Sequence, residues 1–257
     1  MSESMIFTTT SQRIGTRTYQ QDRCFAAADQ DGHRAIGLIC DGMGGMEDGE
    51  RASQMTLETF IEDYDNLLDH PDNYYGFLHQ EMIELDRQVS EIENEDGRSL
   101  NTGTTFVGAI IEEDKAQWVS VGDSKIFIIR KGEMVSVVKE HNYLMVLNYR
   151  LKNGQITMKE YEREALYGAG LISYIGMGNL SLIEANREPF RLQDGDILLL
   201  CSDGLTNALS EERILSIIME NPAHPGYIHN RLQDEAEYAS DRGQDNTTIV
   251  TLYYRLI

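Results

Sequence analysis

The sequence predicts an α+β protein whose strands pair antiparallel. Short runs rich in Val, Ile and Leu, which are typical of buried strands, come in consecutive groups and do not alternate strictly with helices. Two long segments with apolar side chains at helical spacing separate the first group of strands from the second. This order favours an antiparallel arrangement over a doubly wound parallel sheet, which needs a helix between successive strands.

The first group contains strands at 24–28 and 34–40, joined through the turn residues Asp29-Gln30-Asp31-Gly32. Amphipathic helices follow at 50–68 and 74–92. From residue 104 the pattern turns to β. Strands at 105–111, 116–121, 124–130 and 134–138 predict one continuous meander, with Lys131-Gly132 as a tight turn.

The second half is less regular. Within 142–178 only a helix near 158–166 is indicated. Strands are predicted at 182–190 and 196–202, and the chain turns helical from residue 205, with a good helix start at Ser210-Glu211-Glu212. A helix over 229–240 and a closing strand over 247–254 complete the chain.

The composition excludes several classes of function. With 41% hydrophobic residues in 257, the chain can bury a sizeable core. It carries 22 basic and 43 acidic residues, a net charge of −21, which argues against binding nucleic acid or an anionic membrane surface. A basic peptide segment would be a more favourable ligand.

The cellular compartment can be predicted from the cysteine pattern and from the lack of a signal peptide or membrane span in the sequence. The three cysteines, Cys24, Cys40 and Cys201, form no close pair and no zinc spacing, so we expect small buried hydrophobes in a reducing compartment. The first ten residues do not resemble a signal peptide, and no apolar run approaches the ~20 residues of a membrane span. We therefore expect a cytoplasmic protein.

Four aspartates stand at or beside the ends of short apolar runs: Asp41, Asp123, Asp203 and Asp245. Taken singly, each has an ordinary explanation as a bend, a turn or a helix cap. If the strand ends meet, however, the carboxylates share a small space in which they repel one another. A hard divalent cation such as Mg²⁺ or Mn²⁺ removes that repulsion, so the four together predict a carboxylate metal site.

Six motifs in the order of the chain resemble those of the metal-dependent protein serine/threonine phosphatases, the type 2C or PPM family, in its bacterial form. They are Gly15-Thr16-Arg17-Thr18-Tyr19-Gln20-Gln21-Asp22, Asp41-Gly42-Met43-Gly44-Gly45 with Gly49-Glu50-Arg51-Ala52-Ser53 behind it, Gly103-Thr104-Thr105, Val121-Gly122-Asp123-Ser124-Lys125, Ser202-Asp203-Gly204 and Asp245-Asn246-Thr247-Thr248. Any one of these motifs is weak, but six in order are highly specific.

This resemblance implies a four-layer α-β-β-α sandwich of two antiparallel sheets flanked by helices. It implies one catalytic domain over residues 1–257, with a flap at about 142–178 beside the metal cleft. The implied activity is hydrolysis of phosphoserine and phosphothreonine in proteins by a metal-activated water, without a covalent intermediate. The substrates would be phosphorylated proteins, those of a partner kinase.

The resemblance also assigns residues to roles. The implied cofactors are two Mn²⁺ or Mg²⁺ ions, with a third, weaker position. Asp41 would bridge the two ions, the Gly42 carbonyl would bind one, and Asp203 and Asp245 would hold the other. The remaining roles fall to Asp22, which would act through bound waters, to Asp123, which with Asp203 would offer the third position, and to Arg17, which would hold the substrate phosphate.

The sequence departs from the family pattern at three places. Met43 stands where many eukaryotic members have His, a candidate general acid, so the acid for the leaving group is unidentified. Gln21 replaces a frequent Glu, and Lys125 replaces Arg. The string around His141 resembles a family Asp-His-Ser string, where a structural role in capping the following segment is favoured over proton transfer.

Two alternative interpretations of the sequence remain. Asp29-Gln30-Asp31-Gly32 superficially resembles the nucleophile motif of haloacid-dehalogenase-like hydrolases, although that class needs a parallel sheet after it. The second alternative is a non-catalytic, phosphoprotein-binding module on the phosphatase fold, for which Gln21 and Lys125 are mild hints.

Overall fold

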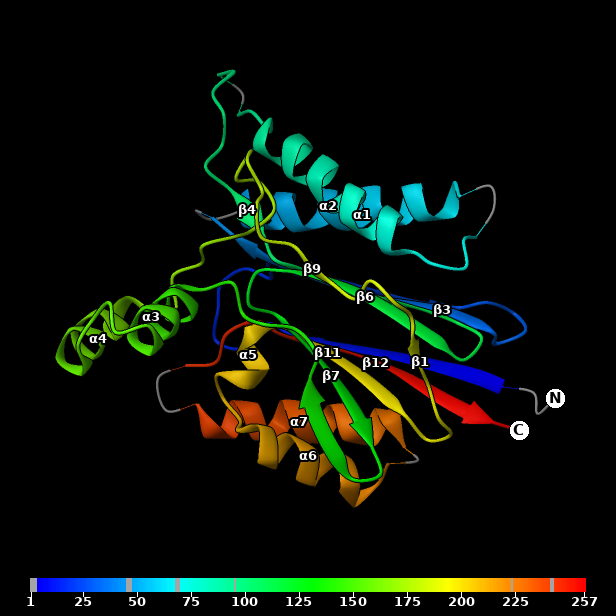
Figure 1. Ribbon diagram of the computed structural model, residues 1–257. Helices are drawn as coiled ribbons and strands as arrows, with labels where there is room; N and C mark the ends of the chain where they lie inside the picture. The colour runs from blue at the N-terminus through cyan, green and yellow to red at the C-terminus, as the bar shows by residue number, and fades with distance from the viewer. Residues whose placement is uncertain (1–3, 45–47, 68–69, 95, 223, 241–242) are drawn as a thin grey trace.

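The computed structural model describes residues 4–44, 48–67, 70–94, 96–222, 224–240 and 243–257. Its elements stack as helices, sheet, sheet and helices, with the α1–α2 pair above and the α6–α7 pair below in Figure 1. None of the described helices combines the length and the apolar character that a membrane crossing requires. The four-layer α+β sandwich that the sequence and the resemblance predicted is confirmed.

One sheet has seven strands in the main order β10-β6-β5-β3-β2, with β4 paired to β3 and β9 paired to β6, and its pairs are antiparallel. Its strands are β2 (Asp22–Ala28), β3 (Arg34–Met43), β4 (Gly103–Thr104), β5 (Phe106–Glu112), β6 (Lys115–Val121), β9 (Glu184–Ala185) and β10 (Phe190–Arg191).

The other sheet has five antiparallel strands in the order β1-β12-β11-β7-β8. Its strands are β1 (Ser4–Arg13), β7 (Lys125–Arg130), β8 (Glu133–Ser136), β11 (Ile197–Cys201) and β12 (Thr247–Leu256). The strands β1 and β12 are the first and last in the described part of the chain, and they pair along ten residues.

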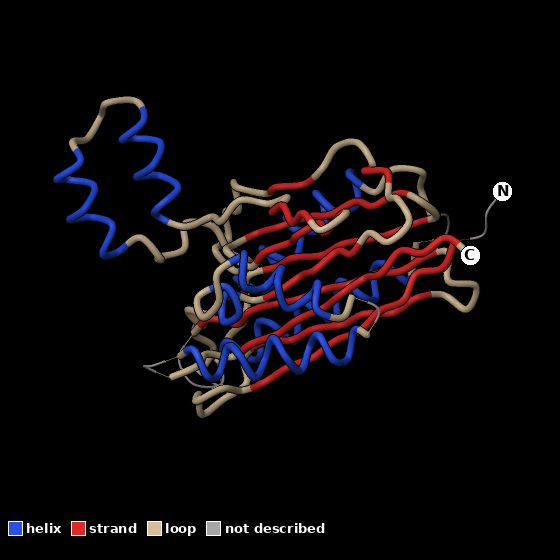
Figure 2. Tube along the Cα trace, turned by 90° about the horizontal axis from the view of Figure 1, so that it is seen from below, coloured by secondary structure: helices blue, strands red, loops and turns tan. Residues whose placement is uncertain are grey.

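Two helix pairs cover the outer faces of the sheets. The helices α1 (Asp48–Asp65) and α2 (Tyr75–Ser90) lie on the seven-stranded sheet, and α6 (Glu211–Glu220) and α7 (Pro225–Ala239) lie on the five-stranded sheet. The short helix α5 (Asp203–Thr206) follows β11 directly. The helices α3 (Tyr143–Lys152) and α4 (Met158–Glu164), followed by a 3-10 turn at Ala165–Tyr167, form a hairpin that projects away from the sandwich (Figures 1 and 2).

Strand alternation divides the core into three layers. In β11, Leu198 and Leu200 face the other sheet, whereas Ile197 and Leu199 face α6 and α7. In β3, Ile39 likewise faces the space between the sheets, with its neighbours packed under α1 and α2. Buried apolar contact on both sides of each sheet explains why these strands read as continuous apolar runs.

The predicted meander is wrong. The pairs β5–β6 and β7–β8 form as expected, but β6 and β7 belong to different sheets. The chain leaves one sheet at Val121 and enters the other at Lys125, through a bend in which Gly122 has φ +106°. A side chain at Gly122 would also meet Thr105 at 2.7 Å, so only glycine fits this crossing.

The strand predicted at 182–190 is also wrong as a continuous element. Only Glu184–Ala185 and Phe190–Arg191 pair with β6. Between them the Asn186 side chain accepts from the Trp118 amide at 2.7 Å and donates to the Ala116 carbonyl at 3.1 Å, so a side chain replaces the backbone ladder.

Two elements were missed, and the last helix shows the largest difference in where a helix begins. The strand β1 is rich in Thr, Ser and Gln and partly exposed, and α3 buries only Leu147, so neither has a clear apolar period. The last helix begins at Pro225, not at 229. Of the helix predicted at 50–68, the structure places 50–65 in α1, and residue 68 lies outside the described ranges.

Candidate active site

The acidic side chains gather at one end of the sandwich, in the space between the two sheets. Asp22 and Asp41 are directly opposite each other at the paired ends of β2 and β3. Because side chains alternate along a strand, Asp41 lies on the same face as Ile39, and Asp22 on the same face as Cys24 and Ala26, which is the face toward the second sheet.

Asp22 is fully buried and held by the second sheet. Its Oδ2 accepts hydrogen bonds from Ser202 Oγ at 2.8 Å and Thr248 Oγ1 at 2.6 Å. Its Oδ1 is buried without a hydrogen-bond partner. A buried carboxylate oxygen without a hydrogen bond is costly, and it is expected at a site where that oxygen accepts a hydrogen bond from a water or coordinates a cation.

Asp41 is positioned through its backbone. Its amide donates to Thr105 Oγ1 at 3.2 Å, and its carbonyl accepts from the Thr105 amide at 2.9 Å. The next residue, Gly42, packs so closely that a Cβ there would lie 2.1 Å from the Gly49 carbonyl oxygen and 2.7 Å from that of Gln21. Glycine at this position therefore lets β3, the Gln21 segment and the start of α1 meet.

The other three aspartates arrive from the second sheet and from the crossing between the sheets. Asp123 lies in the bend between β6 and β7, Asp203 is the first residue of α5 after β11, and Asp245 comes two residues before β12. These strand ends coincide because Cys201 pairs with both Lys125 and Ile249 in neighbouring strands. The fold thus brings together segments that are more than a hundred residues apart in the chain.

One pocket of about 410 Å³ opens onto this cluster. Six of the seven residues predicted for the site line it: Arg17, Asp41, Gly42, Asp123, Asp203 and Asp245. The seventh, Asp22, is buried at the end of β2, opposite Asp41. Ala169, Gly170 and Leu171, from the segment 142–178, also line it.

The carboxylates repel one another. Burial, reinforced by the charges of Asp22 and Asp203, raises the pKa of Asp41 well above its usual range. Burial and the charge of Asp203 raise the pKa of Asp123 to about 7. Burial raises the pKa of Asp22 to about 6, although its two hydroxyl donors act in the opposite direction. Burial together with Asp245 raises the pKa of Asp203 as well.

Arg17 brings a positive charge to the mouth of the pocket. Its Nη2 lies 2.5 Å from Asp245 Oδ2, and its side chain remains 57% exposed. The loop that carries Arg17 is held by Asn246, whose Nδ2 donates to the carbonyls of Ile14 and Tyr19 and whose Oδ1 accepts from the Gln21 amide. An exposed guanidinium beside a carboxylate cluster is available to an anionic ligand.

Three supporting residues have roles that the sequence analysis did not assign: Ser202, Thr248 and Asn246. All three belong to motifs that it did single out, Ser202-Asp203-Gly204 and Asp245-Asn246-Thr247-Thr248. The type of residue was the available clue, because a hydroxyl or an amide close in sequence to an acidic ligand candidate can orient a second acid or hold a neighbouring loop.

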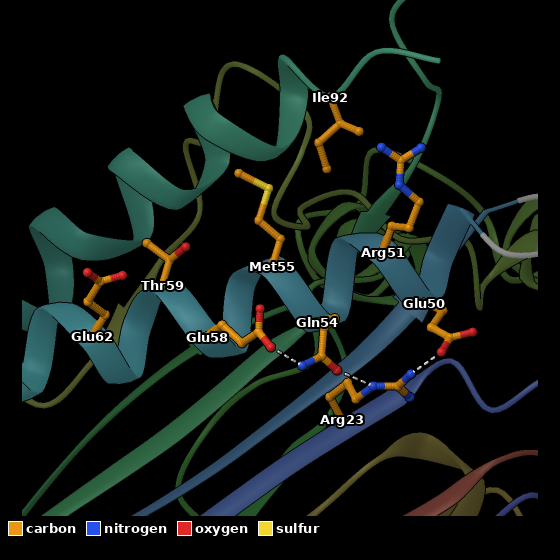
Figure 3. Close-up of a pocket in the computed structure, with 9 residues that line it drawn as sticks. All are labelled: Arg23, Glu50, Arg51, Gln54, Met55, Glu58, Thr59, Glu62 and Ile92. Atoms are coloured by element: carbon orange, nitrogen blue, oxygen red, sulfur yellow. Dashed lines mark hydrogen bonds and ion pairs between the residues drawn. The ribbon is translucent and has the colours of Figure 1, made fainter. Parts of the chain in front are cut away.

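A separate and larger groove of about 840 Å³ lies along the outer face of α1 (Figure 3). Its polar side chains largely pair with one another: Arg23 donates to Gln54 at 2.6 Å and pairs with Glu50, and Gln54 donates to Glu58 at 2.6 Å. Arg23 also donates to the Asp22 carbonyl at 2.7 Å, so it ties the end of β2 to α1. Two of the acids that line this groove, Glu50 and Glu58, are thus engaged by Arg23 and Gln54, so we place the candidate site in the acidic pocket.

The donor set of the acidic pocket fits a hard divalent cation. It consists of oxygen atoms and carries excess negative charge, and the unpartnered Oδ1 of Asp22, the residue opposite Asp41 in the paired strand, adds a further oxygen beside it. Within the described ranges, no three acidic, histidine or cysteine side chains are already arranged to hold an ion. Asp245, for one, is held by Arg17. The pocket therefore presents the donors of a cation site without its closed geometry.

Comparison with known proteins decides the family. The protein phosphatase 2C family matches residues 11–236. The chain belongs to the protein phosphatase 2C family. This phosphatase is 30% identical over 236 residues to protein phosphatase PhpP of Streptococcus pneumoniae, covering 91% of each chain. It is 27% identical over 223 residues to a putative protein phosphatase 2C-type of Streptococcus pyogenes, covering 84% of each.

Solved structures agree with this assignment. The S. agalactiae serine/threonine phosphatase superposes with a TM-score of 0.79 at 25% identity, covering 96% of this chain and 99% of that one. The catalytic domain of the phosphatase PstP, solved with two manganese ions, has the same fold, with a TM-score of 0.75 at 22% identity over 98% of this chain and 99% of that one. The phosphatase is thus a protein serine/threonine phosphatase of the PPM type.

The haloacid-dehalogenase reading is overturned by the same findings. Residues 29–32 form the turn of the antiparallel β2–β3 hairpin, where Asp29 Oδ1 accepts from the amides of His33 and Arg34. The predicted hairpin turn is confirmed, and the strands that follow it in the described part of the chain pair antiparallel.

Proposed function

We propose that this phosphatase hydrolyses phosphoserine and phosphothreonine in proteins through a water activated by two Mn²⁺ or Mg²⁺ ions, without a covalent enzyme intermediate. The observation that carries the proposal is the convergence of five aspartates on one end of the sandwich, four of them lining a pocket that also contains Arg17. The whole chain would act as one catalytic domain, with residues 142–178 as its flap.

The chain supplies the ligands and their placement. Asp41 would bridge two cations, the Gly42 carbonyl would bind one, and Asp203 and Asp245 would hold the other. Asp123, with Asp203, would offer a third and weaker position. When bound, such cations neutralise the substrate phosphate and activate a water for attack on phosphorus.

Asp22 would act behind these ligands, through ordered waters. Its Oδ2 is occupied by Ser202 and Thr248, which leaves Oδ1 to receive a further donor. The two hydroxyls fix the orientation of the carboxylate, because both donate to the same oxygen atom. This geometry suits a residue that orients water and does not itself move.

Arg17 would bind the transferred phosphate. Its planar guanidinium can donate two parallel hydrogen bonds to phosphate oxygens, and the charge that the transition state spreads over those oxygens strengthens both. Its present partner, Asp245, is itself a proposed metal ligand, so neutralisation of Asp245 by a cation would free Arg17 for substrate. Met43 has no proton to give, and we infer that the leaving oxygen takes its proton from solvent in the pocket.

The test is hydrolysis of a phosphothreonine peptide and a phosphoserine peptide by the purified chain. We expect turnover with Mn²⁺ or Mg²⁺, none with EDTA, and recovery when Mn²⁺ is restored. Asp41→Asn and Asp203→Asn should each lower kcat by at least about a hundredfold. Asp72→Asn, an exposed carboxylate outside the pocket, is the matched control and should be unchanged.

Two outcomes would contradict the proposal. Full activity in EDTA would exclude a metal-activated water. Manganese binding without turnover would instead favour the alternative of a non-catalytic, phosphoprotein-binding module. The identity of the partner kinase's substrates can then be sought by comparing the phosphoproteome of a strain that lacks the gene with that of its parent.

A further inference from the structure

His141 is buried, only 4% exposed, at the point where the flap leaves the sandwich. The sequence analysis expected it to cap the following segment. The cap of α3 is instead the next residue, Asn142, whose Oδ1 accepts from the Met145 amide. The imidazole of His141 is therefore free of that role and makes a different contact.

That contact is with the bend that carries Asp123. The Gly122 amide donates to His141 Nδ1 at 3.2 Å, and the His141 amide donates to the Gly122 carbonyl at 2.8 Å. The two residues thus close a reciprocal pair of hydrogen bonds one position before Asp123. Burial lowers the pKa of His141, so the imidazole is neutral near pH 7 and its Nδ1 can accept.

The same residue holds the other arm of the flap. The His141 carbonyl accepts from the Ile172 amide at 2.9 Å, and beside it the Tyr143 amide donates to the Gly170 carbonyl at 2.8 Å. Gly170 and Leu171 line the acidic pocket. The outgoing and returning arms of the flap are therefore joined at His141, within hydrogen-bond distance of the Asp123 bend.

A second set of contacts joins the segment after Asp123 to the start of the flap. Lys125 Nζ lies 2.8 Å from Glu140 Oε1 and 3.4 Å from Glu211 Oε1. Glu140 Oε2 in turn accepts from Asn142 Nδ2 at 2.7 Å. The residues immediately around Asp123 are thus fixed at two points to the segment where the flap begins.

We propose that His141 is a positioning residue that couples the flap to the Asp123 bend, so that the flap arm lining the pocket and the Asp123 carboxylate keep one relative placement. Its role in turnover rests on the function proposed above, whereas the coupling itself does not. Removing the Nδ1 acceptor should loosen both the bend and the returning arm while the sheets remain intact.

The test compares three variants of the full chain. His141→Leu removes the acceptor and keeps the apolar volume. His141→Asn keeps an acceptor atom bonded to Cγ, as Nδ1 is in histidine, and should therefore retain the protection and the activity of the wild type. His229→Leu is the matched control, because His229 is also buried but contacts Thr9 and Thr251, away from the flap.

Amide hydrogen exchange at Gly122 and Ile172 is the first measurement, with Val250 in β12 as the internal reference. In His141→Leu we expect exchange at both amides to rise at least about tenfold relative to Val250. The same variant should lower kcat/KM on a phosphopeptide by at least about tenfold, and His141→Asn should stay within about threefold of wild type. His229→Leu should leave the exchange ratio unchanged.

Unchanged protection of Gly122 and Ile172 in His141→Leu would overturn the coupling, as would an equal loss in His229→Leu. Altered exchange with wild-type kcat/KM would overturn the positioning role. Altered exchange with no turnover by the wild-type protein would leave the coupling standing and would instead refute the proposed function.

Discussion

Arg17 and Asp245, 228 positions apart in sequence, form an ion pair at the mouth of the acidic pocket, with Nη2 2.5 Å from Oδ2. One residue is the only Arg lining the pocket among the described residues, and the other is one of its acids. The pair therefore joins the proposed phosphate-binding and metal-binding parts of the site. Because both side chains are more than a third exposed, we ascribe to the contact a role in function and little in stability.

Arg17→Lys should lower kcat/KM for a phosphopeptide by about tenfold, and Arg17→Met by about a hundredfold. Lysine keeps the charge but loses the planar fork, and methionine loses both. Steady-state kinetics in saturating Mn²⁺ give the ratio. Arg51→Lys, an exposed arginine on α1 outside the pocket, is the control. Equal kinetics for wild type and Arg17→Met would remove Arg17 from substrate binding.

Asp22→Asn should stabilise the metal-free protein by about 1–2 kcal/mol, because it removes one buried negative charge from the cluster. The new amide can keep both hydroxyl donors on its oxygen and place its nitrogen where Oδ1 now lacks a partner. Urea unfolding with EDTA measures this gain. With Mn²⁺ at a hundred times its Kd, the free energy of unfolding of the wild type should rise by about 2.7 kcal/mol. That of the variant should rise by less. A variant less stable than wild type in EDTA would contradict the account.

Glu81 on α2 predicts a pH dependence of stability that is independent of catalysis. Burial, with Asp63 of α1 and Glu84 nearby, raises its pKa from 4.5 to about 8, and its Oε1 is buried without a partner. The folded state therefore binds this proton more tightly than the unfolded state. The stability that Glu81 contributes is complete below pH 4.5 and is lost as the pH rises to about 8.

Glu81→Gln should accordingly stabilise the protein by about 1–3 kcal/mol near pH 8 and have little effect near pH 5. Urea unfolding across this range measures the difference. Glu212→Gln, an exposed acid in the first turn of α6 on the other sheet, should not change the slope over the same interval. If both variants had parallel pH profiles, Glu81 would not be the titrating group.

Gly42→Ala should destabilise the protein by about 2–4 kcal/mol and reduce its response to Mn²⁺. The added methyl would lie 2.1 Å from the Gly49 carbonyl oxygen, and backbone cannot move aside as a flexible side chain can. Thermal unfolding with and without Mn²⁺ measures both effects. Gly226→Ala, where the added methyl meets nothing within 4 Å, is the matched control.

Much of the site could be predicted from the sequence, because its residues occupy short motifs beside strand ends. Asp41, Asp203 and Asp245 each adjoin an apolar run, and the structure brings these ends together. The supporting contacts could not be predicted in the same way. Nothing in the local sequence says that Ser202 and Thr248 donate to the same oxygen of Asp22, since that depends on how the two sheets face each other.

The errors in the fold have physical causes of the same kind. Consecutive strands with a short connection normally pair, but the chain passes at Gly122 from one sheet to the other. The strand β1 and the helix α3 escaped detection because an edge strand and a projecting helix bury too few side chains to show a period. The strand predicted at 182–190 is interrupted at Asn186, because the side chain of Asn186 makes the hydrogen bonds to β6 that a strand backbone would make.

By itself the sequence determined the α+β class, most of the elements and most of the acidic residues that line the pocket, because these follow from hydrophobic period, turn residues and residue type. The tertiary structure alone decided which strands share a sheet, which donors hold Asp22, and that the Gly122 amide donates to the imidazole of His141. Local pattern fixes the conformation of a segment, whereas contacts between segments far apart in the chain depend on how complete layers pack.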